Sequence, residues 1–173
     1  INTRLDEASI EEEEACLRVL GLSVIMQTKL HLRDLVKRGG GNIMVVSSIA
    51  AFAPTSNEFA VLYGPVKTFM NRFVEAINSA YNKDKIYATS VCPGFTSTEF
   101  HEMSGTQDRM DKVPSFMKMS SDAVAKEGIL GMDRKKEIVI TGALNRFLMN
   151  LLRFFPTPLI KIIGNALAGG RYK

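Results

Sequence analysis

Apolar positions recur along this chain with two periods, which predict an alternation of helices and strands. Steps of three and four residues between apolar positions run from Ser9 to about Arg38 and again over 59–82, a spacing typical of a helical face. Ser9 fits an N-terminal helix cap because Glu12 follows three residues later, as in a capping box. The broad apolar face of the first helix predicts that it is covered on more than one side.

Three short apolar runs between the helices predict buried strands. They cover residues 42–47, 85–92 and 137–141. A further helix of about 121–131, for which Ser120 is the expected cap, precedes the third run. Strands separated by long helices imply parallel crossovers, so the pattern predicts an α/β fold in which helices cover both faces of a parallel sheet.

The remaining segments have weaker patterns. Residues 95–120 are expected to be irregular, with short helical pieces. The end of the chain is an apolar, basic segment that Pro156 and Pro158 divide into two helices. The length of 173 residues fits a single domain over 1–173.

Composition and charge narrow the class of protein. The sequence is 46% hydrophobic and 23% charged, which is ordinary for a soluble globular protein. The net charge is +4, but the basic residues are scattered and lack interleaved aromatic residues, which argues against nucleic-acid binding. No uninterrupted apolar stretch is long enough to span a bilayer, and we expect a cytoplasmic protein.

The cysteines and histidines predict neither a disulfide nor a metal site. Cys16 and Cys92 lie in apolar runs without motif spacing, so we expect buried free thiols. His31 and His101 have no cysteine or histidine at the spacing of metal ligands.

Polar side chains gather at the predicted carboxyl ends of the first two strands, where sheets of this kind bind ligands. Ser48 follows the first strand, and Pro93 and Gly94 follow the second. Tyr63 and Lys67 lie four residues apart on the intervening helix, so both project from one face. A nearby cation stabilises a phenolate, and the pair therefore predicts a tyrosine that exchanges protons, although such a pair also arises by chance.

Three segments together resemble the short-chain dehydrogenase/reductase family. They are Asn42–Ala51, Tyr63–Lys67 and Val91–Thr98, in the order and approximate spacing of the family. The resemblance implies a Rossmann-like doubly wound parallel sheet and an oxidoreductase that uses NADP or NAD. Such an enzyme reduces a small-molecule carbonyl or oxidises an alcohol by hydride transfer, and the two long helices form a homodimer or homotetramer.

The resemblance also implies a role for each matching residue. Ser48 hydrogen-bonds the carbonyl oxygen of the substrate, and Tyr63 is the general acid in reduction and the base in oxidation. Lys67 lowers the pKa of Tyr63, and both residues hold the coenzyme, Lys67 through its ribose hydroxyls. The nicotinamide pocket is lined by Pro93, Gly94, Thr96 and Thr98.

The chain departs from the family on its N-terminal side. Family members begin with a strand, a glycine-rich turn and a helix that bind the coenzyme pyrophosphate. Here the glycine cluster Gly39–Gly41 precedes a strand, where it cannot cradle phosphate at a helix N-terminus. We therefore expect a fold that is incomplete in its N-terminal half, with an unpaired edge on the 42–47 strand. A fragment of a longer chain is the favoured explanation, and a truncated gene product is the other.

Two smaller departures concern the site itself. Leu20 stands where the family usually has an asparagine that completes a proton relay to the lysine. The spacing between Ser48 and Tyr63 is slightly wider than usual, which leaves Ser47 as an alternative to Ser48.

Two other functions stay open at this point. The chain is alternatively a non-catalytic family member that serves as a dimerisation or partner-binding module. Residues 144–168 mix apolar and basic side chains, which suits peripheral contact with a membrane as well as closure over a substrate pocket. Aromatic residues hint at an apolar substrate, although core packing explains them equally well: Phe52, Phe59, Phe95, Phe100 and Phe116.

Overall fold

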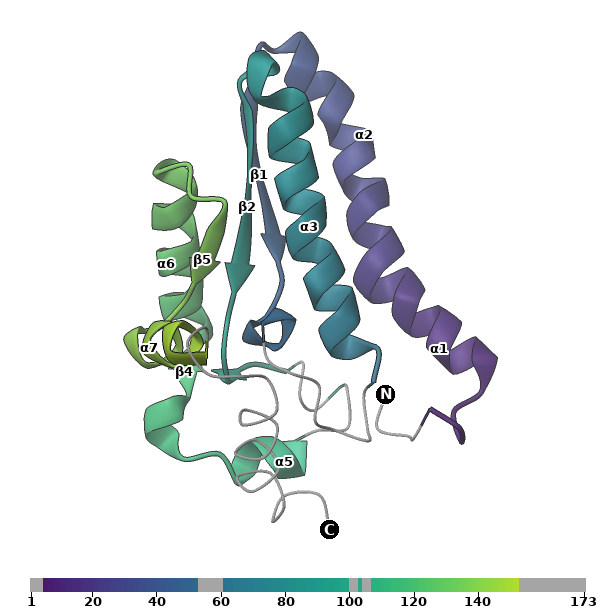
Figure 1. Ribbon diagram of the computed structural model, residues 1–173, viewed down its shortest axis with the longest axis vertical. Coiled ribbons are helices and arrows are strands. Elements are labelled where there is room, and N and C mark those ends of the chain that lie inside the picture. Colours follow the sequence, from purple (N-terminus) through teal and green to yellow (C-terminus); the bar gives the residue numbers. More distant parts are fainter. Residues whose placement is uncertain (1–4, 53–60, 100–102, 104–106, 153–173) are drawn as a thin grey trace.

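The structure, a computed structural model, describes residues 5–52, 61–99, 103 and 107–152. In this part of the chain helices lie on either side of a small parallel sheet (Figure 1). The predicted α/β fold is therefore confirmed, and the small sheet agrees with an incomplete Rossmann-like fold. The predicted breaks at Pro156 and Pro158 lie outside the described residues.

The main sheet places the first two predicted strands next to each other. Its order is β1 (Gly41–Val46), β2 (Ile86–Cys92) and β5 (Ile138–Ile140), all parallel. Val46 of β1 and Val139 of β5 both lie opposite Val91 of β2. The carboxyl ends of all three strands therefore meet at one edge of the sheet, where the candidate residues lie.

The first long helix covers the predicted range but is not uniform. It consists of α1 (Ile10–Leu17), a π-helical turn η1 (Arg18–Leu22) and α2 (Ser23–Lys37). The capping box is confirmed, because the Ser9 hydroxyl accepts a hydrogen bond from the Glu12 N–H at 3.2 Å and the Glu12 carboxylate accepts one from the Ser9 N–H at 3.0 Å. The π turn was not predicted, since one turn of π-helix barely changes the apolar spacing.

α3 (Tyr63–Tyr81) covers one face of the sheet and builds the main core there. The helix begins later than the predicted residue 59, and Pro65 lies in its first turn, where its missing N–H costs no helical hydrogen bond. Leu20 packs against this core from η1. The core joins the apolar face of α3 to inward-facing residues of β1 and β2, namely Val45, Val66, Met70, Val74, Ile77 and Ala88.

α6 (Ser121–Asp133) covers the opposite face and approaches the strands through glycines. A Cβ on Gly131 would lie 2.3 Å from Cγ2 of Val139, and one on Gly128 would lie 3.0 Å from Cγ2 of Val91. Ser120 caps this helix as predicted, since its hydroxyl accepts a hydrogen bond from the Ala123 N–H at 3.2 Å. α7 (Ala143–Leu152) follows β5.

A second, two-stranded parallel sheet lies in the region that was predicted to be irregular. β3 (Thr96–Ser97) follows β2 closely and pairs with β4 (Met119–Ser120), while α5 (Gln107–Asp111) lies between them in sequence. Two-residue strands have no periodicity for a sequence pattern to reveal. The pairing of β3 with β4 fixes the path of the chain that leaves β2. Pro93 and Gly94, two of the candidate site residues, lie on that chain.

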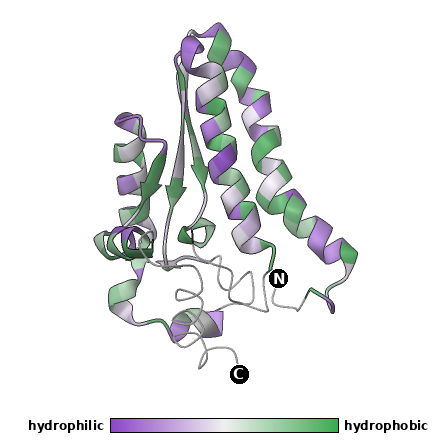
Figure 2. Cartoon of the chain, viewed as in Figure 1, coloured by the Kyte–Doolittle hydropathy of each residue, from purple (hydrophilic) through white to green (hydrophobic). Residues whose placement is uncertain are grey.

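Within the described residues of this single chain, α3 covers one side of the first long helix, and cover on a further side stays a prediction. One side of α1, η1 and α2 packs towards α3, and the other exposes large apolar side chains. Figure 2 shows alternating hydrophobic and hydrophilic bands along these helices. The exposed residues are Ile10, Leu17, Val19, Leu22, Met26, Leu30 and Val36.

Candidate active site

Ser48 stands directly beyond the carboxyl end of β1, in a loop that is tied to the next strand. Its hydroxyl accepts a hydrogen bond from the Ala50 N–H at 3.1 Å and so caps the short helix η2 (Ile49–Ala51). The Ile49 N–H donates to the Pro93 carbonyl at 2.9 Å. The loops that follow β1 and β2 are therefore joined by a backbone hydrogen bond between Ile49, the residue after Ser48, and Pro93.

Ser47, the alternative to Ser48, points to a different place. Its side chain is buried, and its hydroxyl donates to the Lys67 carbonyl at 2.9 Å. Ser47 therefore anchors the first turns of α3 to the end of β1, whereas Ser48 lies beside Tyr63.

Tyr63 is the first residue of α3, and its hydroxyl shares a hydrogen bond with the Ser48 side chain. Burial raises the pKa of the Tyr63 phenol above its usual value, and the hydrogen bond with Ser48 lowers it by less. The phenol is therefore protonated at neutral pH. A protonated phenol beside a second hydroxyl can donate a proton to a bound oxygen atom.

Lys67 lies one turn further along α3, with its ammonium facing the ring of Tyr63. Its ammonium is 5.6 Å from the centroid of the Tyr63 ring and donates a hydrogen bond to the Val46 carbonyl at 3.1 Å. Only 7% of the residue is exposed. Burial lowers the pKa of the Lys67 ammonium, while the thiols of Cys92 and Cys16 raise it by less.

The effect of Lys67 on Tyr63 differs from the sequence-based expectation. The resemblance implied a lowered pKa for Tyr63, but the pKa is raised. The physical reason is that burial of the phenol outweighs its hydrogen bond with Ser48, while the Lys67 ammonium donates its hydrogen bond to the Val46 carbonyl.

The residues expected at the nicotinamide pocket lie on the chain that leaves β2. Pro93 and Gly94 are half-buried between β2 and β3, and the Thr96 hydroxyl donates to the Gly94 carbonyl at 3.1 Å. Thr98 lies beyond β3 and is exposed. The structure thus brings Pro93 to the Ser48 loop, whereas Thr98 lies further along the chain, on the far side of β3.

The chemistry of these side chains fits one end of a nicotinamide coenzyme. A hydroxyl, a phenol and an ammonium lie together at the strand ends, and such donors can hold ribose hydroxyls and polarise a carbonyl oxygen. The described residues contain no strand followed by a glycine-rich turn and a helix, the arrangement that binds pyrophosphate. The described residues therefore fit the nicotinamide end of the coenzyme and not its pyrophosphate.

The proton relay expected of the family has no polar partner at Leu20. This side chain packs against the apolar core from η1, as a leucine should. Cys16, one turn earlier on α1, slightly raises the pKa of Lys67, and burial raises the pKa of the Cys16 thiol itself. Cys16 is only half-buried and Cys92 is buried, and both are free thiols as predicted.

Sequence reasoning missed several buried polar residues that contact the elements carrying the candidate site. The Ser90 hydroxyl donates to Oδ1 of Asn71 at 2.6 Å, which joins β2 to α3 in the buried interior. Asn145 on α7 is buried against Gly94. No local signal marks these residues, because their partners are far away in sequence.

A separate cleft of about 420 Å³ lies between α6 and the outer edge of β5. None of Ser48, Tyr63 and Lys67 lines it, so it does not belong to the candidate site. Over the described ranges we find no cluster of three metal-ligating side chains, and no helix there is long and apolar enough to cross a membrane.

The predicted membrane contact falls only partly within the described chain. On α7, Leu144, Phe147 and Leu151 are exposed at helical spacing. The remainder of 144–168 lies outside the described residues, so contact with a membrane stays a prediction.

Comparison with known proteins identifies the family. A family model described as short chain dehydrogenase matches residues 1–109. The chain is 29% identical over 118 residues to the probable oxidoreductase EphD of Mycobacterium tuberculosis, a match that covers 60% of this chain and 20% of that protein. It is 27% identical over 108 residues to the very-long-chain 3-oxoacyl-CoA reductase of Homo sapiens, covering 62% of this chain and 31% of the reductase.

Solved structures show the same fold. A short-chain dehydrogenase from Sphingobium yanoikuyae in complex with NADPH superposes with a TM-score of 0.73 at 20% identity, covering 90% of this chain and 61% of that chain. A gluconate 5-dehydrogenase from Burkholderia cenocepacia in complex with NADP and tartrate gives 0.68 at 16% identity, covering 82% and 58%. The chain therefore spans only part of each relative. Because the family model matches well over half of its residues, the chain belongs to the short-chain dehydrogenase family.

Proposed function

We propose that this chain supplies the catalytic and substrate-binding part of an oxidoreductase that transfers hydride between NADP or NAD and a carbonyl or alcohol. The observation that carries the proposal is the hydrogen bond between Ser48 and Tyr63 above the buried Lys67, at the carboxyl edge of the sheet. A hydroxyl and a protonated phenol at one point suit an oxygen atom on which negative charge develops.

The three residues divide the chemistry as follows. Ser48 donates a hydrogen bond to the carbonyl oxygen, and Tyr63 gives that oxygen its phenolic proton as the carbonyl carbon is reduced. The bound coenzyme supplies the hydride. Lys67 is held at the end of β1 by the Val46 carbonyl, with its ammonium 5.6 Å from the centroid of the Tyr63 ring, and it would offset the negative charge that remains on Tyr63. In alcohol oxidation Tyr63 takes the proton back.

The same site suggests how the coenzyme would bind and which class of substrate it would serve. Pro93, Gly94, Thr96 and Thr98 would line the nicotinamide side, and the relatives solved with NADPH or NADP support this assignment. A small-molecule carbonyl or alcohol is the proposed substrate class, and the similarity to a very-long-chain 3-oxoacyl-CoA reductase favours an apolar one.

Titration of the intact protein with NADPH and with NADH tests the proposal. We expect at least one of the two coenzymes to bind with micromolar affinity. Binding is measured by the fluorescence of the reduced nicotinamide. His31→Gln, on the exposed side of α2, is the matched control and should bind equally well. Absence of binding by the intact protein would reject the enzyme and favour the alternative, a non-catalytic dimerisation module.

We also propose that the exposed side of the first long helix binds a second copy of the chain. Met26 and Leu30 are 55% and 71% exposed, and several apolar neighbours continue the surface. An apolar surface of this kind on a helix is typical of a subunit interface. The expected result is a dimer or tetramer that the double variant Met26→Glu/Leu30→Glu converts to monomer, measured by analytical ultracentrifugation.

The control for this interface is Lys29→Glu, an exposed position on the same helix that is already polar. It should leave the oligomer intact. A protein that is monomeric without any substitution contradicts the proposed interface.

A further inference from the structure

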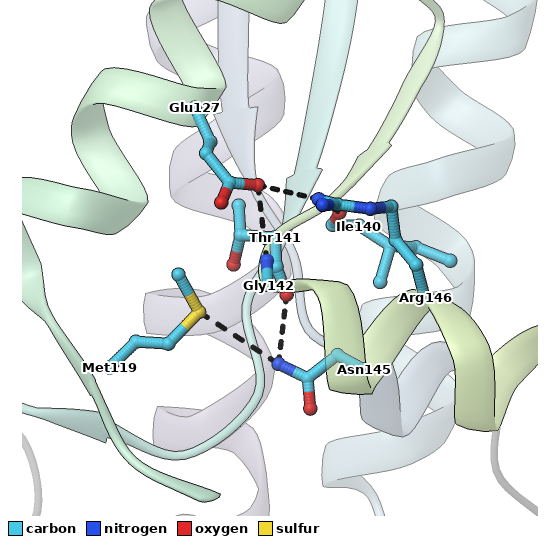
Figure 3. A network of polar contacts seen from close by, with 7 residues as sticks. All are labelled: Met119, Glu127, Ile140, Thr141, Gly142, Asn145 and Arg146. Carbon is cyan, nitrogen blue, oxygen red and sulfur yellow. Dashed lines mark hydrogen bonds and ion pairs between the residues drawn. The ribbon is translucent and has the colours of Figure 1, made fainter. Parts of the chain in front are cut away.

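The turn between β5 and α7 is held in place by a charged side chain from α6 (Figure 3). The Glu127 carboxylate accepts a hydrogen bond from the Gly142 N–H at 3.0 Å and an ion-paired one from Arg146 at 2.7 Å. Arg146 also donates to the Ile140 carbonyl at 3.2 Å. One carboxylate thus fixes both the backbone of the turn and the first turn of α7, which sets the position of the next inward-facing residue.

That residue is Asn145, and only 6% of it is exposed. Its side-chain amide donates to the Thr141 carbonyl at 2.8 Å, which locks the orientation of the carboxamide. Gly142 has a φ of +82°, and a Cβ there would lie 2.7 Å from Sδ of Met119. Glycine is therefore required for the turn that presents Asn145.

Asn145 lies directly against the backbone of Gly94. A Cβ built on Gly94 would lie 2.5 Å from Nδ2, 2.7 Å from Oδ1 and 2.8 Å from Cγ of Asn145. These distances are shorter than any van der Waals contact, so the carboxamide occupies the space that a side chain at position 94 would need. The backbone after β2 can therefore not move towards α7.

The same loop is fixed on its other sides by backbone hydrogen bonds. The Phe95 carbonyl accepts from the Met119 N–H at 2.9 Å, and the Pro93 carbonyl accepts from the Ile49 N–H at 2.9 Å. The second bond reaches the residue beside Ser48. A shift of the loop at Gly94 would therefore pass to the proposed nicotinamide pocket and to the Ser48 loop.

We infer that Asn145, held by the Glu127–Arg146 ion pair, is a positioning residue that sets the Pro93–Gly94 loop against the coenzyme. The inference rests on the proposed function. Asn145 acts through Gly94 and touches no reacting atom. A displacement of about 1 Å at a reacting centre is enough for a roughly hundredfold loss of rate, so a backing residue of this kind matters to catalysis.

A double-mutant cycle between Gly94 and Asn145 in the intact protein tests the inference. Gly94→Ala should weaken coenzyme binding and lower kcat/KM roughly a hundredfold, since the new methyl group collides with the carboxamide. Asn145→Ala should lower coenzyme affinity and kcat/KM about tenfold each, because the Pro93–Gly94 loop loses its contact with the carboxamide. The double variant should resemble Asn145→Ala alone, since truncation removes the colliding atoms.

Coenzyme Kd and the midpoint of denaturant unfolding are measured for all four proteins, together with kcat and KM. Asn150→Ala, exposed on α7, is the matched control and should change none of them. Losses that multiply in the double variant would overturn the inference, because residues in contact should couple. Coupling in the unfolding midpoint alone, with an unchanged coenzyme Kd for Asn145→Ala, would also overturn it and leave Asn145 a purely structural residue.

Failure of the proposed function gives a different result. In that case the protein without substitutions binds no coenzyme, and only the unfolding cycle is informative. Coupling between the two positions in unfolding would then show only the contact between Asn145 and Gly94, and the role of Asn145 towards the coenzyme would fall together with the proposed function.

Discussion

Replacing Tyr63 by phenylalanine is expected to abolish carbonyl reduction by the intact protein. The substitution removes one oxygen atom, which shares a hydrogen bond with Ser48 and carries the proton that the proposed mechanism delivers. Proton transfer by a positioned side chain contributes about 10²–10⁴-fold to rate, so kcat should fall by that factor. The measurement is coenzyme-dependent carbonyl reduction in steady state, with coenzyme Kd determined in parallel.

Tyr81→Phe is the matched control, since it makes the same change at the other end of α3. It should retain full activity. Coenzyme binding should persist in Tyr63→Phe, because the coenzyme retains its other contacts. Turnover that survives Tyr63→Phe would mean that another group donates the proton.

Replacing Lys67 by methionine is expected to stabilise the protein while it inactivates the enzyme. The ammonium is almost fully buried and has one backbone carbonyl and a methionine sulfur as its hydrogen-bond partners. Burying a charge costs several kcal/mol, and methionine fills a similar volume without that cost, so the free energy of unfolding should rise by about 1–3 kcal/mol. Turnover should fall about a hundredfold or more, because the developing charge on Tyr63 loses its counter-ion.

The pH dependence gives this prediction a second readout. Burial lowers the pKa of Lys67 in the folded protein below the value of about 10.4 expected when it is unfolded. Between these two values the unfolded state binds more protons, so the stability of the unsubstituted protein rises with pH. The advantage of Lys67→Met should therefore be largest at neutral pH and shrink towards pH 10, measured by urea unfolding.

Lys83→Met, at an exposed position beyond α3, is the control and should change stability little at either pH. A destabilised Lys67→Met protein would show that the hydrogen bond to the Val46 carbonyl outweighs the cost of burying the charge.

Most of the framework could be predicted from the sequence, because it follows from local patterns. The capping box at Ser9, the cap at Ser120 and the three strands of the main sheet depend on residue types at short spacing. Ser48, Pro93 and Tyr63 were expected together because parallel strands end at one edge of the sheet. Each of these inferences needs only a few neighbouring residues.

Other features depend on partners that are distant in the sequence. The β3–β4 pair joins Thr96 to Met119, and Asn145 reaches Gly94 across about fifty positions. The exposed side of the first long helix has the same apolar residues as a buried one, so periodicity could not show that α3 covers only one side. No local pattern encodes such contacts.

The sequence by itself determined the order of strands and helices, the edge of the sheet that carries the chemistry, and the residue types gathered there. Only the tertiary structure decided the state of those residues. It placed Ser47 under α3 and Ser48 beside Tyr63, and it turned the Lys67 ammonium towards the Val46 carbonyl. The physical reason is that a pKa depends on burial and on the direction of each hydrogen bond, which arise when distant segments pack together.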